Sequence, residues 1–263
     1  MFYFVTMQLP VDDFLRFEFR ELGSTQQAAR ALAFQFPGRK LAVRAHRQTA
    51  GRGQRGSAWL SAPGKNLTAS WMLYPDALPV SVVFLLNMVA SLAVTEWLKQ
   101  QLPTSAELQI KWPNDILVDG KKIAGILIET QLQKRQISSA CVGIGLNVGQ
   151  EEFSGSFSRA PTSLKLLQVH TSEALLAEAF EVIGSNLLKG LQQATRKGFR
   201  SLYPTYAAQL FGLGQWRPFQ LLHPAKPPTN CIGRIESVVP SGELVVEIDG
   251  AQWQFAFKEI RQL

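Results

Sequence analysis

The stretch that organises this chain reads Gln48-Thr49-Ala50-Gly51-Arg52-Gly53-Gln54-Arg55-Gly56. Its glycines leave backbone N–H groups accessible to an anion, and its arginines can add bidentate contacts to a phosphate or a carboxylate. The run Leu41 to His46, which precedes it, is typical of a β-strand. We therefore expect a loop after a strand that clamps the phosphate of a nucleotide.

Two other interpretations apply to the same stretch. Gly51, Gly53 and Gly56 match the spacing of a dinucleotide-binding fingerprint, but that motif needs a helix to begin inside it. The following residues, 57–64, predict a loop instead. A flexible glycine loop with solvated arginines is the simpler alternative, and the string alone supports it about equally well.

Composition sets broad limits on the protein. The chain has 263 residues, of which 46% are hydrophobic, so it can bury one large domain and a small one. A net charge of +7 favours an acidic partner, a phosphorylated substrate or nucleic acid. The basic residues are spread along the chain and form no long run, so a nucleic-acid-binding arm is not supported.

Cysteine and histidine form no recognisable motif. Cys141 and Cys231 are far apart and lie in no Cys-x-x-Cys pattern, so we expect two buried thiols in a reducing cytoplasm. His46, His170 and His223 are equally scattered. The sequence therefore supports neither a metal site nor a Ser-His-Asp arrangement.

Two apolar segments raise the question of membrane targeting. Residues 1–7 are apolar but lack a basic leader, so they make a poor signal peptide. The run from Val80 to Leu98 is interrupted by polar residues, which a buried core helix tolerates better than a membrane span. We expect a protein that stays in the cytoplasm and contacts no membrane.

Periodicity and turn signals predict an α+β chain. Asp119-Gly120 between two apolar runs is a strong hairpin signal, and the spacing of Ser24 and Gln27 predicts that Ser24 or Thr25 caps a helix. The expected strands are 41–46, 66–74, 108–112, 116–118, 121–129 and 136–148, and the expected helices are 28–33, 81–101, 171–191 and 199–210. After Gly214, the short runs 217–222, 231–239, 243–248 and 252–257 fit a small β-barrel.

Five blocks in order closely resemble the biotin protein ligases, the enzymes that biotinylate acetyl-CoA carboxylase. The blocks are Gly23-Ser24-Thr25, Gln48 to Gly56 with Trp59, Lys111 to Ile116, Lys122 to Glu129, and Gly143 to Val148. One block alone would be a weak signal, whereas five in the family's order are a strong one. The barrel-like tail also fits the family's small C-terminal domain.

The resemblance implies a mixed-sheet catalytic domain of the class II synthetase type over residues 1–213, followed by an SH3-like barrel over residues 214–263. It also implies a two-step reaction. Biotin and Mg-ATP first form biotinoyl-5′-AMP and pyrophosphate, and a lysine of a biotin carboxyl carrier protein then attacks the mixed anhydride. Such chemistry needs positioning and positive electrostatics more than a protein nucleophile.

The resemblance also implies roles for single residues. It assigns biotin or adenylate contacts to Ser24, Thr25, Gln26, Gln48, Gly51, Arg52, Gly53, Gln54, Trp59, Lys122, Gly125, Gly143 and Gly145. Lys122 and Arg52 are the catalytic candidates, with Lys122 beside the reacting carboxylate and α-phosphate. The three glycines of the strands would let a ligand lie against the sheet.

The nucleotide side is less well defined. Asn114, Asp115 and Asn147 match positions near the nucleotide, and Asp115 is a candidate ligand for Mg²⁺, although the sequence does not identify the metal ligands. Lys111 and Trp112 are more simply explained as a structural strand end.

The chain departs from the family pattern at two positions. Gln26 stands where relatives often have Asn, and Gln54 where many have Arg, which removes a positive charge near the adenylate. No winged-helix segment precedes Ser24, so DNA binding as a repressor is not expected. The resemblance is compatible with a homodimer formed at a sheet edge.

Two alternative functions stay open. A lipoate or other acyl-protein ligase would resemble this family in fold, although the intact Gly51-Arg52-Gly53 block favours biotin. A non-catalytic basic protein could use the barrel to bind nucleic acid, which requires exposed aromatic side chains. Trp253, Phe255 and Phe257 alternate instead like residues of a barrel interior.

Overall fold

The computed structural model describes residues 4–8, 13–76, 78–223 and 226–263. Part of the N-terminal stretch that we expect not to be a signal peptide, residues 1–3, lies outside the described residues. A large sheet contains β1 (Phe4–Gln8), β2 (Leu15–Leu22), β3 (Leu41–Gln48), β4 (Leu67–Leu73), β5 (Leu78–Pro79), β6 (Leu108–Lys111), β7 (Asp115–Val118), β8 (Lys121–Gln133) and β9 (Gln136–Leu146). The order is β1-β2-β3-β4-β9-β8-β7-β6, with β5 paired to β9. Only β2 and β3 pair in parallel among these described strands, which confirms the predicted mixed sheet.

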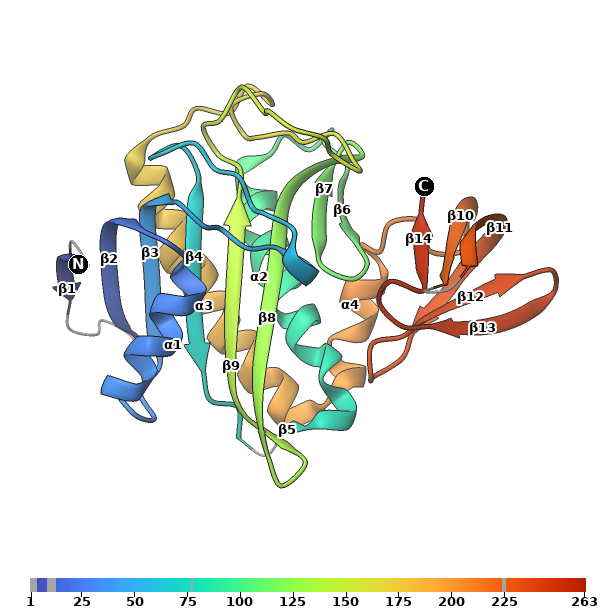
Figure 1. Ribbon diagram of the computed structural model, residues 1–263, viewed down its shortest axis with the longest axis horizontal. Helices are drawn as coiled ribbons and strands as arrows, with labels where there is room; N and C mark the ends of the chain where they lie inside the picture. Colours follow the sequence, from blue (N-terminus) through green and yellow to red (C-terminus); the bar gives the residue numbers. More distant parts are fainter. Residues whose placement is uncertain (1–3, 9–12, 77, 224–225) are drawn as a thin grey trace.

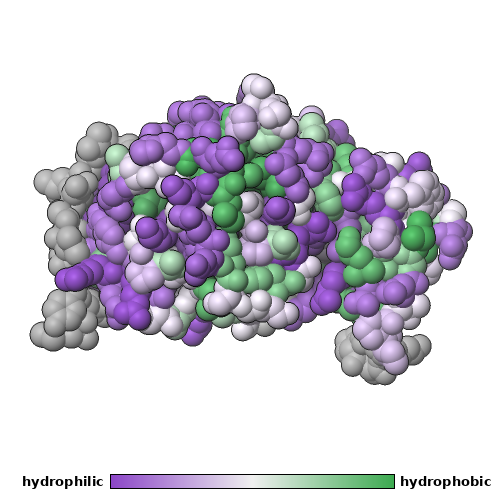
Figure 2. Space-filling model, turned by 90° about the horizontal axis from the view of Figure 1, so that it is seen from above, coloured by the Kyte–Doolittle hydropathy of each residue, from purple (hydrophilic) through white to green (hydrophobic). Residues whose placement is uncertain are grey.

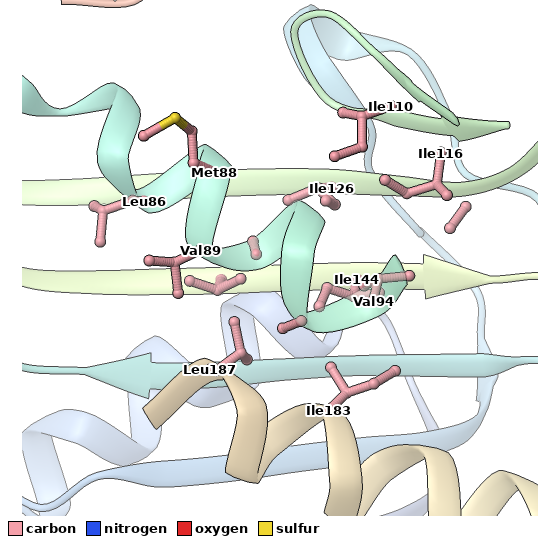
Figure 3. Packing of buried hydrophobic residues seen from close by; sticks show 14 of the residues in the cluster. Leu86, Met88, Val89, Val94, Ile110, Ile116, Ile126, Ile144, Ile183 and Leu187 are labelled. Atoms are coloured by element: carbon pink, nitrogen blue, oxygen red, sulfur yellow. The ribbon is translucent and has the colours of Figure 1, made fainter. Parts of the chain in front are cut away.

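Helices cover both faces of this sheet (Figure 1). The helices are α1 (Thr25–Gln35), α2 (Phe84–Gln101), α3 (Glu173–Lys197) and α4 (Tyr203–Ala207), and the 3₁₀ turns are η1 (Gln54–Gly56), η2 (Val80–Val82) and η3 (Phe199–Ser201). The helix α1 lies on one face, whereas α2 and α3 pack on the other. Figure 3 shows Val89 and Val94 of α2 and Ile183 and Leu187 of α3 in one apolar layer with Ile144 of β9.

The helix α2 is the central element of the core. It is apolar around most of its circumference, and its residues from Phe84 to Leu98 are almost all buried. By length and composition, Val80–Gln101 could also cross a membrane, but 61% of its apolar window is buried inside the protein. This burial agrees with the predicted core helix, because a helix that is hydrophobic all round must be covered on all sides.

The C-terminal part forms a second, five-stranded antiparallel sheet. Its strands are β10 (Trp216–His223), β11 (Lys226–Val238), β12 (Leu244–Ile248), β13 (Ala251–Phe255) and β14 (Ile260–Gln262), in the order β13-β12-β11-β10-β14. It lies beside α4 and the β6–β7 hairpin (Figure 1). A small β region is therefore confirmed for the C-terminal segment.

The expected interior position of Trp253 is wrong. Its side chain is 56% exposed, and Trp216 and Ile232 are also exposed. Figure 2 shows apolar surface at this end of the molecule. The reason is topological: β13 is an edge strand that pairs only with β12 among the described strands, so alternation alone does not bury its residues.

The two sheets share one hydrophobic core. The indole Nε1 of Trp112 donates a hydrogen bond of 3.0 Å to the carbonyl of Gly242, and its ring contacts Phe257 with centroids 5.1 Å apart. Phe84 of α2 contacts the ring of Phe257. Trp112 is thus a structural residue, as the simpler interpretation of this strand end predicted.

Candidate active site

A cavity of about 200 Å³ lies between the glycine-rich loop, the start of α1, and strands β4, β9, β8 and β7. It brings together most of the residues singled out in the sequence, namely Ser24, Thr25, Gln26, Gln48, Arg52, Gly53, Gln54, Trp59, Asn114, Asp115, Lys122, Gly125, Gly143 and Gly145. The cavity thus collects residues from motifs that are distributed along the chain from Ser24 to Gly145.

The glycine-rich loop folds back on itself. The N–H of Gly53 bonds the carbonyl of Ser57 at 2.7 Å, and the N–H of Trp59 bonds the carbonyl of Gly51 at 3.0 Å. A single 3₁₀ turn, η1, connects the two arms, and no α-helix begins within the described loop. The absence of a helix start in the described loop agrees with the prediction that this loop is not a dinucleotide-binding fingerprint. The fold of the loop also places Trp59 in the lining of the cavity.

Gly51 and Asn147 do not line this cavity. A Cβ atom at Gly51 would collide with the backbone carbonyl of Trp59, so this glycine lets the two loop arms approach. Asn147 is buried, and its side-chain amide donates 3.0 Å to the carbonyl of Thr162. The assignment of Asn147 to the nucleotide side is corrected accordingly: it ties the end of β9 to the loop that follows.

One end of the cavity is polar but uncharged. The backbone N–H and the hydroxyl of Thr25 both bond Oε1 of Gln48, at 2.7 and 3.1 Å. The same hydroxyl lies 2.9 Å from Oγ of Ser70 on β4. Ser70 was missed in the sequence, although the alternation of Thr68 and Ser70 in an otherwise apolar strand could have indicated a polar face.

The predicted capping box is not formed. Ser24 occupies the N-cap position of α1, but its side chain makes no capping hydrogen bond. Gln27 is exposed on the helix surface. Ser24 is nevertheless buried and lines the cavity, because the helix N-terminus points there.

The other end of the cavity is charged. Nζ of Lys122 lies 2.6 Å from Oδ1 of Asp115, and 5.5 Å from the centre of the Trp59 ring. Lys122 follows a hairpin turn in which Asp119 and Gly120 have φ angles of 49° and 72°. Lys121 is exposed, so only the second lysine of the pair lines the cavity, as strand alternation predicted.

Gly125, Gly143 and Gly145 leave space on the sheet, and other side chains of this protein fill that space. Gly125 and Gly145 are register partners on β8 and β9, and the indole of Trp59 lies against both, so a Cβ atom at either would collide with it. Gly143, two residues before Gly145, lies under the carboxamide of Gln26 in the same way. The close approach expected of a ligand is thus made here by Trp59 and Gln26.

A second cavity of about 170 Å³ lies between the two sheets. Lys111, Lys258 and Arg261 line it, and Gln54 lines both this cavity and the first one. Burial lowers the pKa of Lys111, and the positive charges of Arg159, Lys122 and Arg261 lower it further, against the opposing charge of Asp115. Among the described lining residues there is no carboxylate, so the second cavity suits an anion.

Carboxylates are scarce in the first cavity too. Asp115 is the only acidic residue among the described residues that line it. One carboxylate with an oxygen left over from the Lys122 pair fits Mg²⁺ that arrives on a nucleotide, because Mg²⁺ keeps several waters and phosphate ligands. Asp115 could hold such an ion, and it would supply charge neutralisation to the phosphates.

A separate cluster joins Glu18, His46 and Glu173 on the surface, with ligand atoms within 4.8 Å of one another. This cluster could not be predicted from the sequence, because the three residues are distant along the chain. The guanidinium of Arg44 bonds both glutamates, at 2.7 and 3.3 Å. That positive charge offsets part of the negative charge of the two glutamates.

The two thiols differ in environment. Cys141 is buried, and burial raises its pKa to about 12. Cys231 is only partly buried, which corrects the expectation of two buried thiols. Neither lines the first cavity among the described residues.

Comparison with known proteins supports a single family. The family model described as "Biotin/lipoate A/B protein ligase family" matches residues 19–147. The chain is 31% identical over 174 residues to the biotin–[acetyl-CoA-carboxylase] ligase of Paracoccus denitrificans, covering 66% of this chain and 72% of that protein. It is 38% identical over 130 residues to the bifunctional ligase/repressor BirA of Bacillus subtilis, covering 49% of this chain but 39% of that protein. The chain therefore spans less than half of that repressor.

Solved structures share the fold over nearly the whole chain. The biotin protein ligase of Aquifex aeolicus in complex with biotin and ATP aligns with a TM-score of 0.72 and 24% identity, covering 94% of this chain and 99% of that one. The biotin protein ligase of Leishmania major in complex with biotinyl-5-AMP aligns with a TM-score of 0.61 and 25% identity, covering 94% of this chain and 100% of that one. The fold described above is thus that of these enzymes.

Proposed function

Because the chain belongs to the biotin/lipoate A/B protein ligase family, we propose that it is a biotin–[acetyl-CoA-carboxylase] ligase. In this proposal it forms biotinoyl-5′-AMP from biotin and Mg-ATP and transfers the biotinoyl group to a lysine of a carboxyl carrier protein. The observation that carries the proposal is the change of polarity along the first cavity.

The two ends of that cavity differ in charge over a short distance. At the uncharged end, Ser70, which contacts Thr25, is the register partner of Gly143. At the charged end, Lys122 and Asp115 lie by Gly125, the register partner of Gly145. Two residues of a strand span roughly 6.6 Å. A molecule with a neutral polar head, an apolar middle and a carboxylate tail fits this sequence of environments, and biotin has that chemistry.

The first step would join two anions. An oxygen of biotin's carboxylate attacks the α-phosphorus, the bond from that phosphorus to the bridging oxygen of the β-phosphate breaks, and pyrophosphate leaves with the bonding electrons. Lys122 would neutralise the approaching charges, and Asp115 would hold its ammonium group in place. Arg52 and Gly53 of the glycine-rich loop, which line the cavity, would position the phosphate.

The second cavity suits the leaving group. Lys111, Lys258 and Arg261 would attract the β- and γ-phosphates, and Gln54 stands at the junction of the two cavities. The proposal therefore places the reacting α-phosphate near Gln54. In the second step, the neutral amine of the carrier lysine attacks the acyl carbon, AMP departs, and the amine's proton passes to solvent.

Further parts of the proposal concern partners and architecture. A basic chain suits an acidic carrier domain. The small C-terminal sheet would be an SH3-like barrel that completes the site through Arg261. A homodimer formed at a sheet edge is also part of this proposal.

The test separates biotin from lipoate. The protein is incubated with Mg-ATP and either biotin or lipoate, while pyrophosphate release is followed and the acyl-adenylate is identified by its mass. The proposal expects pyrophosphate and biotinoyl-5′-AMP with biotin, and transfer when a carrier domain is added. Activity with lipoate alone would establish the acyl-protein ligase alternative, and no adenylate from either acid would contradict both.

A further inference from the structure

We propose that Gln26 sets the depth of the acyl-acid cavity and thereby determines which head groups it accepts. This inference rests on the proposed function. It concerns a side chain that is 5% exposed, the second residue of α1, whose carboxamide forms the wall at the uncharged end of the cavity.

The carboxamide spans three neighbouring strands. Nε2 of Gln26 donates to the carbonyls of Leu127 on β8 and Cys141 on β9, at 3.3 and 3.2 Å. Its Oε1 accepts from the hydroxyl of Ser70 on β4 at 3.3 Å. Since β4, β9 and β8 are adjacent in the sheet, the amide of Gln26 bridges all three strands.

Strand register defines the position of the Gln26 amide over the sheet. Ser70, Gly143 and Leu127 are partners in one row across the sheet. The amide of Gln26 lies over this row, and its Oε1 occupies the place that a Cβ atom of Gly143 would take. Gly143 and Gln26 therefore form one unit in which the glycine leaves the space and the glutamine fills it.

Length matters more in this unit than hydrogen bonding. The three hydrogen bonds, at 3.2–3.3 Å, are at the long end of the usual range, so their stabilisation is modest. An asparagine is one methylene shorter and would withdraw the amide from the row. The cavity would then deepen beside Gly143, where the neutral head group of the acid is expected.

The reacting end of the cavity should not respond. Lys122 lies by Gly125, the register partner of Gly145, whereas Gln26 lies by Gly143 at the other end. A change at Gln26 should therefore alter the KM and the choice of acid, and leave kcat for biotin near its wild-type value. A residue with a purely structural role would instead change the amount of folded enzyme for all acids alike.

The experiment compares biotin with a biotin that carries a methyl group on one ureido nitrogen, using pyrophosphate release from the full-length chain. Loss of the N–H weakens the binding of methylated biotin to every variant. The measured quantity is therefore kcat/KM for methylated biotin divided by kcat/KM for biotin. We expect Gln26→Asn to raise this ratio by about 10- to 200-fold, the usual effect of one methyl group in a pocket. Gln26→Met keeps the length without the hydrogen bonds and should keep the wild-type ratio.

Two further variants serve as controls. Gln27→Asn makes the same chemical change at the exposed neighbour and should leave both constants unchanged. Gly143→Ala should push the Gln26 amide into the cavity and raise the KM for biotin, and Gln26→Asn in the same chain should relieve this, since the two positions share one space. This coupling also tests the inference if Gln26→Asn alone folds poorly.

The outcomes separate the inference from the proposed function. The inference alone would be overturned by three results together. The wild-type protein adenylates biotin, Gln26→Asn leaves the ratio unchanged, and Gln26→Asn does not relieve the effect of Gly143→Ala. Wild-type protein that adenylates neither acid would overturn the proposed function, and the inference would fall with it. A raised ratio with unchanged kcat supports both.

Discussion

Nζ of Lys122 lies 2.6 Å from Oδ1 of Asp115, and this ion pair joins two neighbouring strands at the charged end of the first cavity. Both side chains are partly buried, with exposed fractions of 29% and 21%. Attraction between the charges therefore acts in surroundings that screen less than bulk water does. The pair orients the lysine before a ligand enters, which is the condition for electrostatic preorganisation.

Replacement of Lys122 by alanine should impair adenylation strongly. A preorganised contact of this kind typically contributes about 2.7–4 kcal/mol, so we expect a loss of roughly a hundred- to a thousand-fold in the rate. Pyrophosphate release with saturating biotin and ATP measures it. Lys121→Ala is the matched control, because Lys121 is exposed and should behave like wild type. Equal rates for the two variants, or loss of structure by circular dichroism, would remove Lys122 from the mechanism.

Gln54→Arg should slow the release of biotinoyl-5′-AMP. Gln54 borders both cavities, so an arginine there could hold the adenylate phosphate. A hydrogen bond to a charged group contributes about 1.5–3 kcal/mol, so release should slow by about tenfold or more. A chase with unlabelled biotin measures the rate, with Gln54→Met as the neutral control. If arginine and glutamine release the adenylate equally fast, the side chain at this position does not retain it.

Lys111→Met should weaken ATP binding. The lysine lines the second cavity, and loss of one charged contact to phosphate costs about 1.5–3 kcal/mol, so KM for ATP should rise by about tenfold to a hundredfold. Initial rates at varied ATP test this, and Lys121→Met provides the exposed control. An unchanged KM would exclude Lys111 from the nucleotide site.

The same variant should change the pH dependence of stability. Burial lowers the pKa of Lys111 below 10.5, so its charged form costs folding free energy that is present in full below the folded pKa. As pH rises from the folded pKa to 10.5, the unfolded state binds more protons and the wild type gains stability relative to Lys111→Met. Urea unfolding at neutral and alkaline pH should therefore show the advantage of the variant shrinking as pH rises. A constant difference would contradict the pKa shift.

The two cysteines should react at very different rates. Burial raises the pKa of the Cys141 thiol to about 12, so it stays protonated and inaccessible at pH 8. Cys231 is partly exposed, although burial also raises its pKa. A maleimide should label Cys231 alone in the folded protein and both thiols in denaturant, as peptide mapping by mass would show. Cys231→Ser should abolish labelling of the folded chain, and rapid labelling of Cys141 would contradict the burial.

Local features of the fold were predictable from sequence where short-range chemistry decides them. The Asp119-Gly120 hairpin is confirmed because both residues tolerate positive φ, so the turn needs no distant partner. The core helix α2 was likewise evident from its apolar run. The small β region was recognised from short strands and turns, whereas the exposure of Trp253 was not, because exposure depends on which strand lies at the edge.

The candidate site shows the same division. The residue types and spacing of the glycine-rich loop predicted an anion site, whereas the roles of Lys122 and the strand glycines followed from the resemblance to the biotin protein ligases. Only the tertiary structure decided that Ser70 joins Thr25, that Asn147 serves the backbone, and that Gln26 covers Gly143. The sequence shows which positions carry a polar side chain and which are glycine. The contact that each position makes depends on strand order and register, which bring distant residues into one row.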